Sequence, residues 1–156
     1  VEVSNPGTPP ISVERFIDEF RSRNERLADF MRRLGICEEK GSGVDKVVKA
    51  AEVFQLPAPD FRVGAVRTTA LLFAHQDFAA MSRTDRIRAC YQHCCLMSVS
   101  NQRMSNQSLR ERFGLPESKA ATVSLVIGAA KEAGAIKADE SETNSTRYAR
   151  YLPFWA

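Results

Sequence analysis

Residues 104–115 read Met104-Ser105-Asn106-Gln107-Ser108-Leu109-Arg110-Glu111-Arg112-Phe113-Gly114-Leu115. Ser105 is a good cap for a short helix that carries Leu109 and Phe113, and Gly114 is the type of residue at which a helix ends. Pro116 then favours the start of another helix within a few residues. This sharp reversal is typical of a helix-turn-helix, whose second helix enters the major groove of DNA. The stretch therefore predicts a DNA-binding or regulatory segment rather than an enzyme.

The residues around this stretch complete the order of a winged helix. We expect a helix over 83–96, the short helix after Ser105, a helix over 117–133, and strands at 136–138 and 147–152 joined by a polar loop. The strands would form the wing beside the second helix of the motif. The apolar tail Phe154-Trp155 is expected to pack its rings on the core.

The first half predicts a separate α+β unit. Its expected elements are a strand end over 1–3, helices over 13–20, 25–34 and 44–54, and an antiparallel strand pair over 61–63 and 66–73. Asn24 is expected to cap the second helix and Gly35 to end it. The apolar stripe of the helix over 25–34 is expected to be Leu27, Phe30, Met31 and Leu34. The inward face of the helix over 44–54 is expected to be Val44, Val47, Val48 and Ala51. The fold class is thus α+β, with an α+β regulator core at 1–78, a winged helix-turn-helix at 79–156, and residues 75–81 as the joint.

Composition narrows the class of protein. The 156 residues are 44% hydrophobic and 26% charged, as in ordinary globular domains. No apolar run approaches the roughly 20 residues of a membrane helix, and no secretory signal is present, so we expect a cytoplasmic chain without a membrane partner. A start at Val1 instead of Met predicts a fragment of a longer protein.

Positive charge is concentrated in the second half. Residues 1–81 hold 11 basic and 12 acidic side chains, a net charge of −1, whereas residues 82–156 hold 11 basic and 7 acidic ones, a net charge of +4. Phosphate binding requires a basic surface on the part that touches DNA. The charge distribution agrees with the helix-turn-helix prediction, although an excess of four is a weak signal by itself.

Several short motifs resemble one family over most of the chain. They are Val3-Ser4-Asn5-Pro6-Gly7, Arg23-Asn24, Glu38-Glu39-Lys40-Gly41-Ser42-Gly43-Val44-Asp45, Leu56-Pro57-Ala58-Pro59-Asp60-Phe61 and Tyr151-Leu152-Pro153-Phe154-Trp155-Ala156. Together they resemble the C-terminal region of bacterial and archaeal transcriptional regulators labelled RecG-related ATP-dependent DNA helicases. In that family a Schlafen-type AlbA-like domain comes first and a winged helix often follows. The resemblance implies a regulator whose other partner is the upstream domain of the same protein.

The helicase activity in the family label does not carry over to this chain. A helicase motor needs a Gly-x-x-x-x-Gly-Lys-Ser/Thr phosphate loop, and the sequence has none. The family's first half is also distantly similar to the C-terminal half of GHKL-type ATP-binding domains, where a glycine-rich loop holds phosphates. Gly41, Ser42 and Gly43 fit that loop, but the adenine-reading Asp and the metal-binding upstream segment are missing. We therefore expect no cofactor, no catalytic residue and no enzyme activity, and a remnant of a nucleotide-binding domain stays an alternative.

The Gly41-Ser42-Gly43 loop has two interpretations. Free backbone N–H groups at the start of a helix can bind an anion. A tight turn that needs a positive φ explains the same glycines, and is the more common reason for such a pattern. For Arg23-Asn24, helix capping is favoured over a contact with another domain.

The predicted DNA contacts lie on the two helices of the motif and on the wing. Ser118, Lys119 and Thr122 face outward at the start of the second helix, with Leu125 one turn later, opposite a buried face of Val123, Val126, Ile127, Ala130 and Ala133. Arg110, Arg112 and Arg147 are predicted to hold the phosphate backbone.

The wing favours a different class of partner. Its tip, Asp139 to Ser145, carries three carboxylates that a phosphate backbone would repel. The alternative function is a protein–protein or dimerisation module without DNA contact. We favour sequence-specific DNA binding in transcriptional regulation, as a homodimer, with the first domain transmitting a signal or joining subunits.

The cysteines and a neighbouring histidine suggest a metal site only at first sight. Cys90, His93, Cys94 and Cys95 lie within two turns of one predicted helix, but a structural zinc site needs a second, well-spaced pair of ligands. Buried thiols in a reducing compartment explain them better, so we expect no metal.

Overall fold

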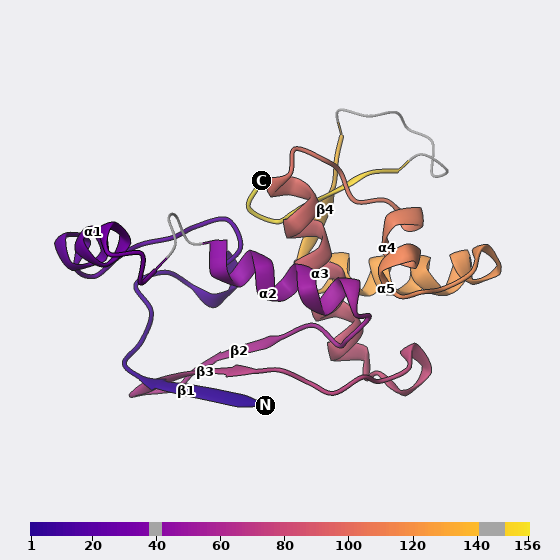
Figure 1. Cartoon of the computed structure of the whole chain (residues 1–156). Helices are drawn as coiled ribbons and strands as arrows, with labels where there is room; N and C mark the ends of the chain where they lie inside the picture. Colours follow the sequence, from indigo (N-terminus) through magenta and orange to yellow (C-terminus); the bar gives the residue numbers. More distant parts are fainter. Residues whose placement is uncertain (38–41, 141–148) are drawn as a thin grey trace.

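The computed structural model describes residues 1–37, 42–140 and 149–156, in a mixed α/β arrangement compatible with the α+β expectation (Figure 1). A three-stranded antiparallel sheet lies in the first half, and a two-stranded sheet lies near the C-terminus. Within these described ranges, no helix is long and apolar enough to cross a membrane.

The larger sheet has the order β1-β3-β2, from β1 (Glu2–Pro6), β2 (Asp60–Val63) and β3 (Arg67–Leu71). The predicted β2–β3 pair is confirmed, with Asp60 opposite Leu71. The first strand is longer than expected, because it continues through Asn5 and Pro6 along β3 instead of turning after Val3. The turn comes at Gly7, whose φ is +93° and whose N–H donates to the Val66 carbonyl oxygen at 2.7 Å.

Of the first two predicted helices, the second forms as expected and the first does not. The helix expected over 13–20 is a single 3-10 turn, η1 (Val13–Arg15), and Ser12 makes no side-chain cap. Helix α1 (Glu25–Arg33) forms as predicted, with the Asn24 side chain accepting a hydrogen bond from the Leu27 N–H at 3.0 Å. Gly35 follows with a φ of +69°, as expected for a residue that ends a helix.

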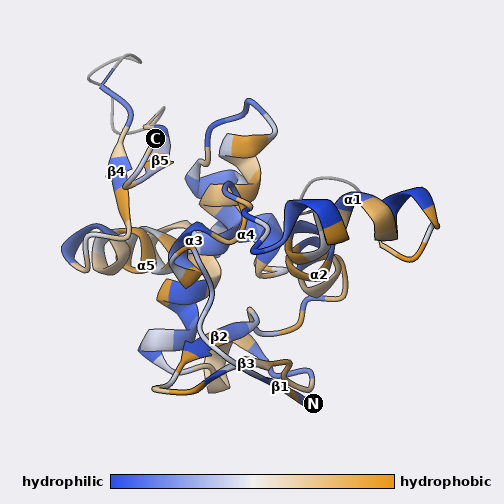
Figure 2. Ribbon diagram, turned by 90° about the vertical axis from the view of Figure 1, so that its left-hand side faces the viewer, coloured by the Kyte–Doolittle hydropathy of each residue, from blue (hydrophilic) through white to orange (hydrophobic). Residues whose placement is uncertain are grey.

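The apolar stripe of α1 is not covered by the described residues. The side chains of Leu27, Phe30 and Leu34 are 52%, 58% and 57% exposed. Helix α1 projects from the rest of the molecule (Figure 1), and its ribbon carries both hydrophilic and hydrophobic residues (Figure 2). Its amphipathic pattern therefore specified a helix but not a buried one.

Helix α2 (Ser42–Val53) packs on the second half through part of its predicted face. Val48 and Ala51 are buried, at 1% and 7% exposed, as expected. Val47 is 40% exposed, which corrects its predicted inward position. The reason is that α2 is covered along one side, where it meets α3, so a residue a quarter-turn away remains at the surface.

The second half follows the predicted order of three helices and a hairpin. It consists of η2 (Phe78–Ala80), α3 (Arg83–Val99), α4 (Asn106–Arg112), η3 (Glu117–Lys119), α5 (Ala120–Glu132), β4 (Ile136–Ala138) and β5 (Tyr151–Pro153). Ser82 and Ser105 each form a capping box at the start of α3 and α4. Gly114, with a φ of +62°, separates α4 from the η3–α5 segment. Strand β5 pairs with β4 and is shorter than the predicted 147–152.

Helix α3 is shared by two hydrophobic clusters. The larger joins α3, α4 and α5 and contains Cys90, Met104, Leu109, Val123 and Ile127, all at most 3% exposed. The smaller joins Ile17 and Val48 of the first half to Cys95. The predicted packing of the tail is confirmed for Trp155, which lies against this smaller cluster and donates to the Tyr91 hydroxyl at 3.2 Å.

The segment between α2 and β2, residues 54–59, packs and hydrogen-bonds against α3. Pro57, Ala58 and Pro59 are buried. The Arg88 side chain donates to the Ala58 carbonyl oxygen at 3.1 Å, and Gln92 donates to that of Pro59 at 2.7 Å. These contacts cross the predicted boundary between residues 78 and 79, and they give two buried carbonyl oxygens of the first half their hydrogen-bond donors.

Candidate nucleic-acid interface

The start of the η3–α5 segment is open to solvent. Ser118 and Lys119 are exposed and Thr122 is half-buried. The opposite face is buried as predicted for Val123, Val126, Ile127 and Ala130. Ala133 is exposed, which corrects its predicted inward position, because α5 ends at Glu132 and the chain turns at Gly134 with a φ of +68°.

Asn106 fixes α4 against the first turn of α5. Its side-chain N–H groups donate to the Ala120 carbonyl oxygen at 2.9 Å and to the Ser124 hydroxyl at 3.0 Å. Its carbonyl oxygen accepts from Arg110 Nε at 3.3 Å. Arg110 is therefore held on the side of α4 that faces the exposed start of α5.

Arg112 is not available to a phosphate backbone, which corrects its predicted role. Its side chain is 1% exposed, and one amino group donates to the Leu56 carbonyl oxygen at 2.7 Å, across from the end of α2. Its Nε lies 3.6 Å from a Glu52 carboxylate oxygen. Burial lowers the pKa of the Arg112 guanidinium, and the charge of Glu52 acts in the opposite direction. The reason is helical geometry, since Arg112 lies three residues after buried Leu109 and so shares its inward face.

One further predicted contact falls on a part of the chain that the structure leaves undescribed. Arg147 lies there, as does most of the wing tip. Asp139, at the described base of the wing, accepts from Arg103 Nε at 2.7 Å, so its charge is balanced within the chain.

The candidate anion loop is only partly described. Gly41 lies outside the described residues, and Ser42 is the first residue of α2. Gly43 is inside α2, has no positive φ, and a Cβ added there would meet nothing within 4 Å. A tight turn with a positive φ therefore does not explain the glycine at position 43, and anion binding by the loop stays a prediction.

The cysteines on α3 are buried, as predicted. Cys90, Cys94 and Cys95 are 0% exposed and carry free thiols. Burial raises the pKa of Cys90 and of Cys95 to about 12, with the charge of Cys95 adding to the effect at Cys90. His93 lies between Glu52, 3.1 Å from its Nδ1, and the Ser108 hydroxyl, 3.1 Å from its Nε2.

Sequence reasoning missed this His93 link and the Arg112 contact for the same reason. Each joins residues of α2 to residues more than 40 positions later in the chain. Nothing in the local spacing of Glu52 indicates either partner. A buried position for Arg112 was the one detectable signal, since it follows Leu109 at helical spacing.

The comparisons with known proteins concern the first half. No curated protein and no solved structure matches the chain significantly. Residues 1–72 match one family, a range that contains α1, α2 and all three strands of the larger sheet. The resemblance inferred from the sequence motifs is thereby confirmed: this part of the chain matches the family described as "Putative ATP-dependent DNA helicase recG C-terminal".

Proposed function

We propose that residues 79–156 form a winged helix that binds DNA, in a regulator whose first 78 residues transmit a signal or join subunits. The order of α3, α4, η3–α5 and the β4–β5 hairpin supports this proposal. Met104 forms an isolated bridge with Tyr151, which places a third extended segment beside β5, between α3 and α4 in sequence. Such a segment is expected where a winged helix has its first short strand.

One observation carries the proposal. The start of the η3–α5 segment is exposed at Ser118 and Lys119, while the face behind it is buried in the core that α3 and α4 share. A recognition helix needs this combination, because its leading residues must reach base edges while its other face holds it rigid. The Lys119 side chain makes no hydrogen bond or ion pair with any residue that the structure describes.

The side chains available for phosphate contacts are Arg110 and Lys119. Arg110 is oriented by Asn106 on α4, and Lys119 lies at the end of η3. Ser118 and Thr122 add hydroxyl groups for contacts to bases or phosphates. The ion pair of Asp139 with Arg103 reduces the repulsion expected from the base of the wing.

Salt-dependent DNA binding tests this function. Fluorescence anisotropy with a random-sequence duplex should show affinity that falls steeply as salt rises. Lys119→Ala and Arg110→Ala should each weaken binding and lower the slope of log affinity against log salt by about one. Lys49→Ala and Arg67→Ala are the matched controls, because both residues are exposed in the first half. Binding without salt dependence, or equal losses in all four variants, would contradict the proposal.

A protein-binding role is the second candidate, and Leu125 favours it. This side chain is 76% exposed and lies one turn after Thr122, on the outward surface of α5. Sedimentation velocity of the chain and of Leu125→Asp separates the two roles. If α5 joins subunits, the dimer dissociates in Leu125→Asp; if α5 reads DNA, the oligomeric state is unchanged and DNA affinity falls.

We also propose that the chain is not an enzyme. The sequence lacks the phosphate loop of a helicase motor, and the half that matches the family ends at residue 72 with the larger sheet. An ATP hydrolysis assay with and without DNA should give no turnover. Turnover that disappears with Gly43→Ala would restore the nucleotide-binding alternative.

A further inference from the structure

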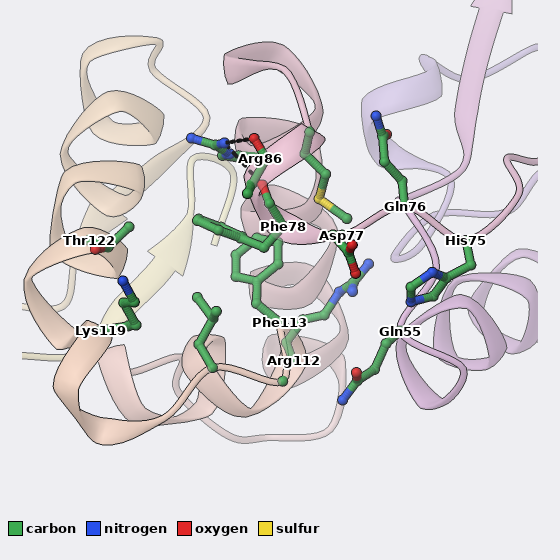
Figure 3. A pocket seen from close by; sticks show the side chains of 14 residues that line it. Gln55, His75, Gln76, Asp77, Phe78, Arg86, Arg112, Phe113, Lys119 and Thr122 are labelled. Carbon is green, nitrogen blue, oxygen red and sulfur yellow. Dashed lines mark hydrogen bonds between the residues drawn. The ribbon is translucent and has the colours of Figure 1, made fainter.

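A pocket of about 620 Å³ lies between the joint at residues 75–81, the end of α4 and the start of α5. This size is within the range that small-molecule sites occupy in proteins. Figure 3 shows Lys119 and Thr122 on one side, His75, Gln76 and Asp77 on the other, and Phe78 and Phe113 between them. Arg86 and Arg112 complete the charged part of the lining.

Arg86 and Arg112 each donate hydrogen bonds to backbone carbonyl oxygens, but each also has a buried N–H group without an acceptor in the described part of the chain. Arg86 donates to the carbonyl oxygens of Phe78 and Ala79 at 2.9 and 3.1 Å, and its guanidinium lies 4.4 Å from the centre of the Phe78 ring. Its Nε is buried without a hydrogen-bond partner among the described residues. The same holds for Nη1 of Arg112, whose residue is 5% exposed.

Unpartnered N–H groups of this kind point to a missing acceptor. A buried donor without a partner costs about 1–3 kcal/mol, and more when it is charged. In Figure 3 the Arg112 guanidinium points towards the side of the pocket that carries Asp77. No ion pair joins these two side chains in the part of the chain that the structure describes, so the acceptor need not come from the protein.

The charges of the lining favour an anion with a single charge. Arg86, Arg112 and Lys119 are cationic, and Asp77 is the one carboxylate among the lining residues. Glu52, 3.6 Å from Arg112, offsets part of the positive charge from behind. A dianionic phosphate would meet repulsion from both carboxylates, whereas a carboxylate ion can form the planar, paired contacts that guanidinium groups favour.

The rest of the lining is suited to an apolar body. The Phe78 and Phe113 rings meet edge to face with their centres 4.9 Å apart, and Leu115 lies beside them. Such a surface favours a ring or branched chain over a fully hydrated ion.

We propose that this pocket binds a small organic acid, with its carboxylate near Arg112 and its apolar body against Phe78 and Phe113. The binding site goes beyond the proposed function and does not depend on it, because the ligand can be measured without DNA. Lys119 and Thr122 belong both to the pocket and to the proposed DNA surface. An occupied pocket would thus alter the start of α5, which gives the joint a way to pass a signal.

Benzoate is a suitable probe, with benzamide as its neutral counterpart of similar shape. Both are titrated into the ¹⁵N-labelled chain at constant ionic strength, and backbone amide shifts are followed. With benzoate the shifts should cluster at residues 75–81 and 112–122, and its affinity should exceed that of benzamide by about tenfold. Equal affinities, or shifts spread over the surface, overturn the proposal.

Two neighbouring alanines provide a matched pair of variants. Ala79 lines the pocket and Ala80 does not, and both are exposed. Ala79→Trp should abolish benzoate binding by filling the pocket, while Ala80→Trp should retain it. Unchanged affinity in Ala79→Trp contradicts the assigned position of the site.

Asp77→Asn tests the electrostatic part without filling space. Asp77 is exposed, and its side chain makes no capping hydrogen bond to η2. Removing its charge should tighten benzoate binding at least about twofold and leave benzamide unaffected, since only the anion is repelled by the carboxylate. Weaker or unchanged benzoate binding would show that the anion does not lie where the structure places the Arg112 guanidinium.

Discussion

Helix α1 and the α4–α5 pair show how differently one chain treats its amphipathic helices. Helix α1 has a regular apolar stripe, yet none of its residues is buried among the described parts of the chain. Helices α4 and α5 have less regular patterns, and their apolar residues form the centre of the larger cluster. The difference teaches that periodicity specifies the helix, whereas burial depends on whether another element lies against the apolar face.

The largest expected effect comes from the same substitution in the two regions. Leu109→Ala empties a fully buried position in the larger cluster and should lower the free energy of unfolding by about 3 kcal/mol. Leu27→Ala in α1, where the side chain is 52% exposed, should change it by less than about 0.5 kcal/mol. Urea unfolding measures both. A comparable loss in Leu27→Ala would show that α1 is covered in solution.

The reaction rates of the cysteine thiols compare how accessible the region around α1 and the core helix α3 are to a reagent in solution. Cys37, close after α1, is exposed, whereas Cys90, Cys94 and Cys95 are buried and burial raises their pKa values. A chromogenic disulfide reagent at neutral pH should detect one fast-reacting thiol. The other three thiols should react at least about 100-fold more slowly. Cys37→Ser should remove the fast phase. A second fast thiol in Cys37→Ser would mean that α3 opens readily.

Substitutions of Arg110 and Arg112 on α4 should have different effects on the free energy of unfolding and on DNA affinity. Arg112→Met should cost about 2 kcal/mol of unfolding free energy, because the Leu56 carbonyl oxygen loses its donor and Glu52 loses a neighbouring positive charge. Arg110→Met should leave stability nearly unchanged and lower DNA affinity. Thermal unfolding and anisotropy on both variants measure the two effects, and a reversed pattern would return Arg112 to the DNA surface.

The smallest effect concerns the cap at the start of α3. Burial acts to raise the pKa of Asp85, but hydrogen bonds from Ser82 and Arg88 and the charge of Arg88 outweigh it, so the pKa is lowered. A carboxylate with a lowered folded pKa stabilises the fold above its unfolded pKa of about 3.9, and this contribution is lost as pH falls through the folded value. Asp85→Asn should therefore cost about 1 kcal/mol at pH 7 and progressively less at more acidic pH.

Asp77→Asn serves as the control for that pH series. Asp77 precedes η2 but makes no side-chain capping bond, so its replacement should cost less unfolding free energy at pH 7 than Asp85→Asn. If both variants lose stability equally, the capping box of Ser82 and Asp85 is not the cause.

The sequence predicted those features that depend on neighbours along the chain. The caps at Asn24, Ser82 and Ser105, the helix ends at Gly35 and Gly114, the β2–β3 pair and the order of elements after Ser82 all follow from short-range chemistry. The family of residues 1–72 followed from motifs whose spacing is also local. The helix expected over 13–20 was wrong, since this stretch forms only the single turn of η1.

The partner that each side chain meets was decided by the tertiary structure. Arg112 and Arg110 lie two residues apart, yet one is buried against the end of α2 and the other faces α5. The Glu52–His93 contact and the pocket at the joint likewise combine segments far apart in sequence. Sequence fixes local conformation because hydrogen bonds of helices and turns span a few residues. Burial and site geometry come from packing between distant elements, which no local pattern encodes.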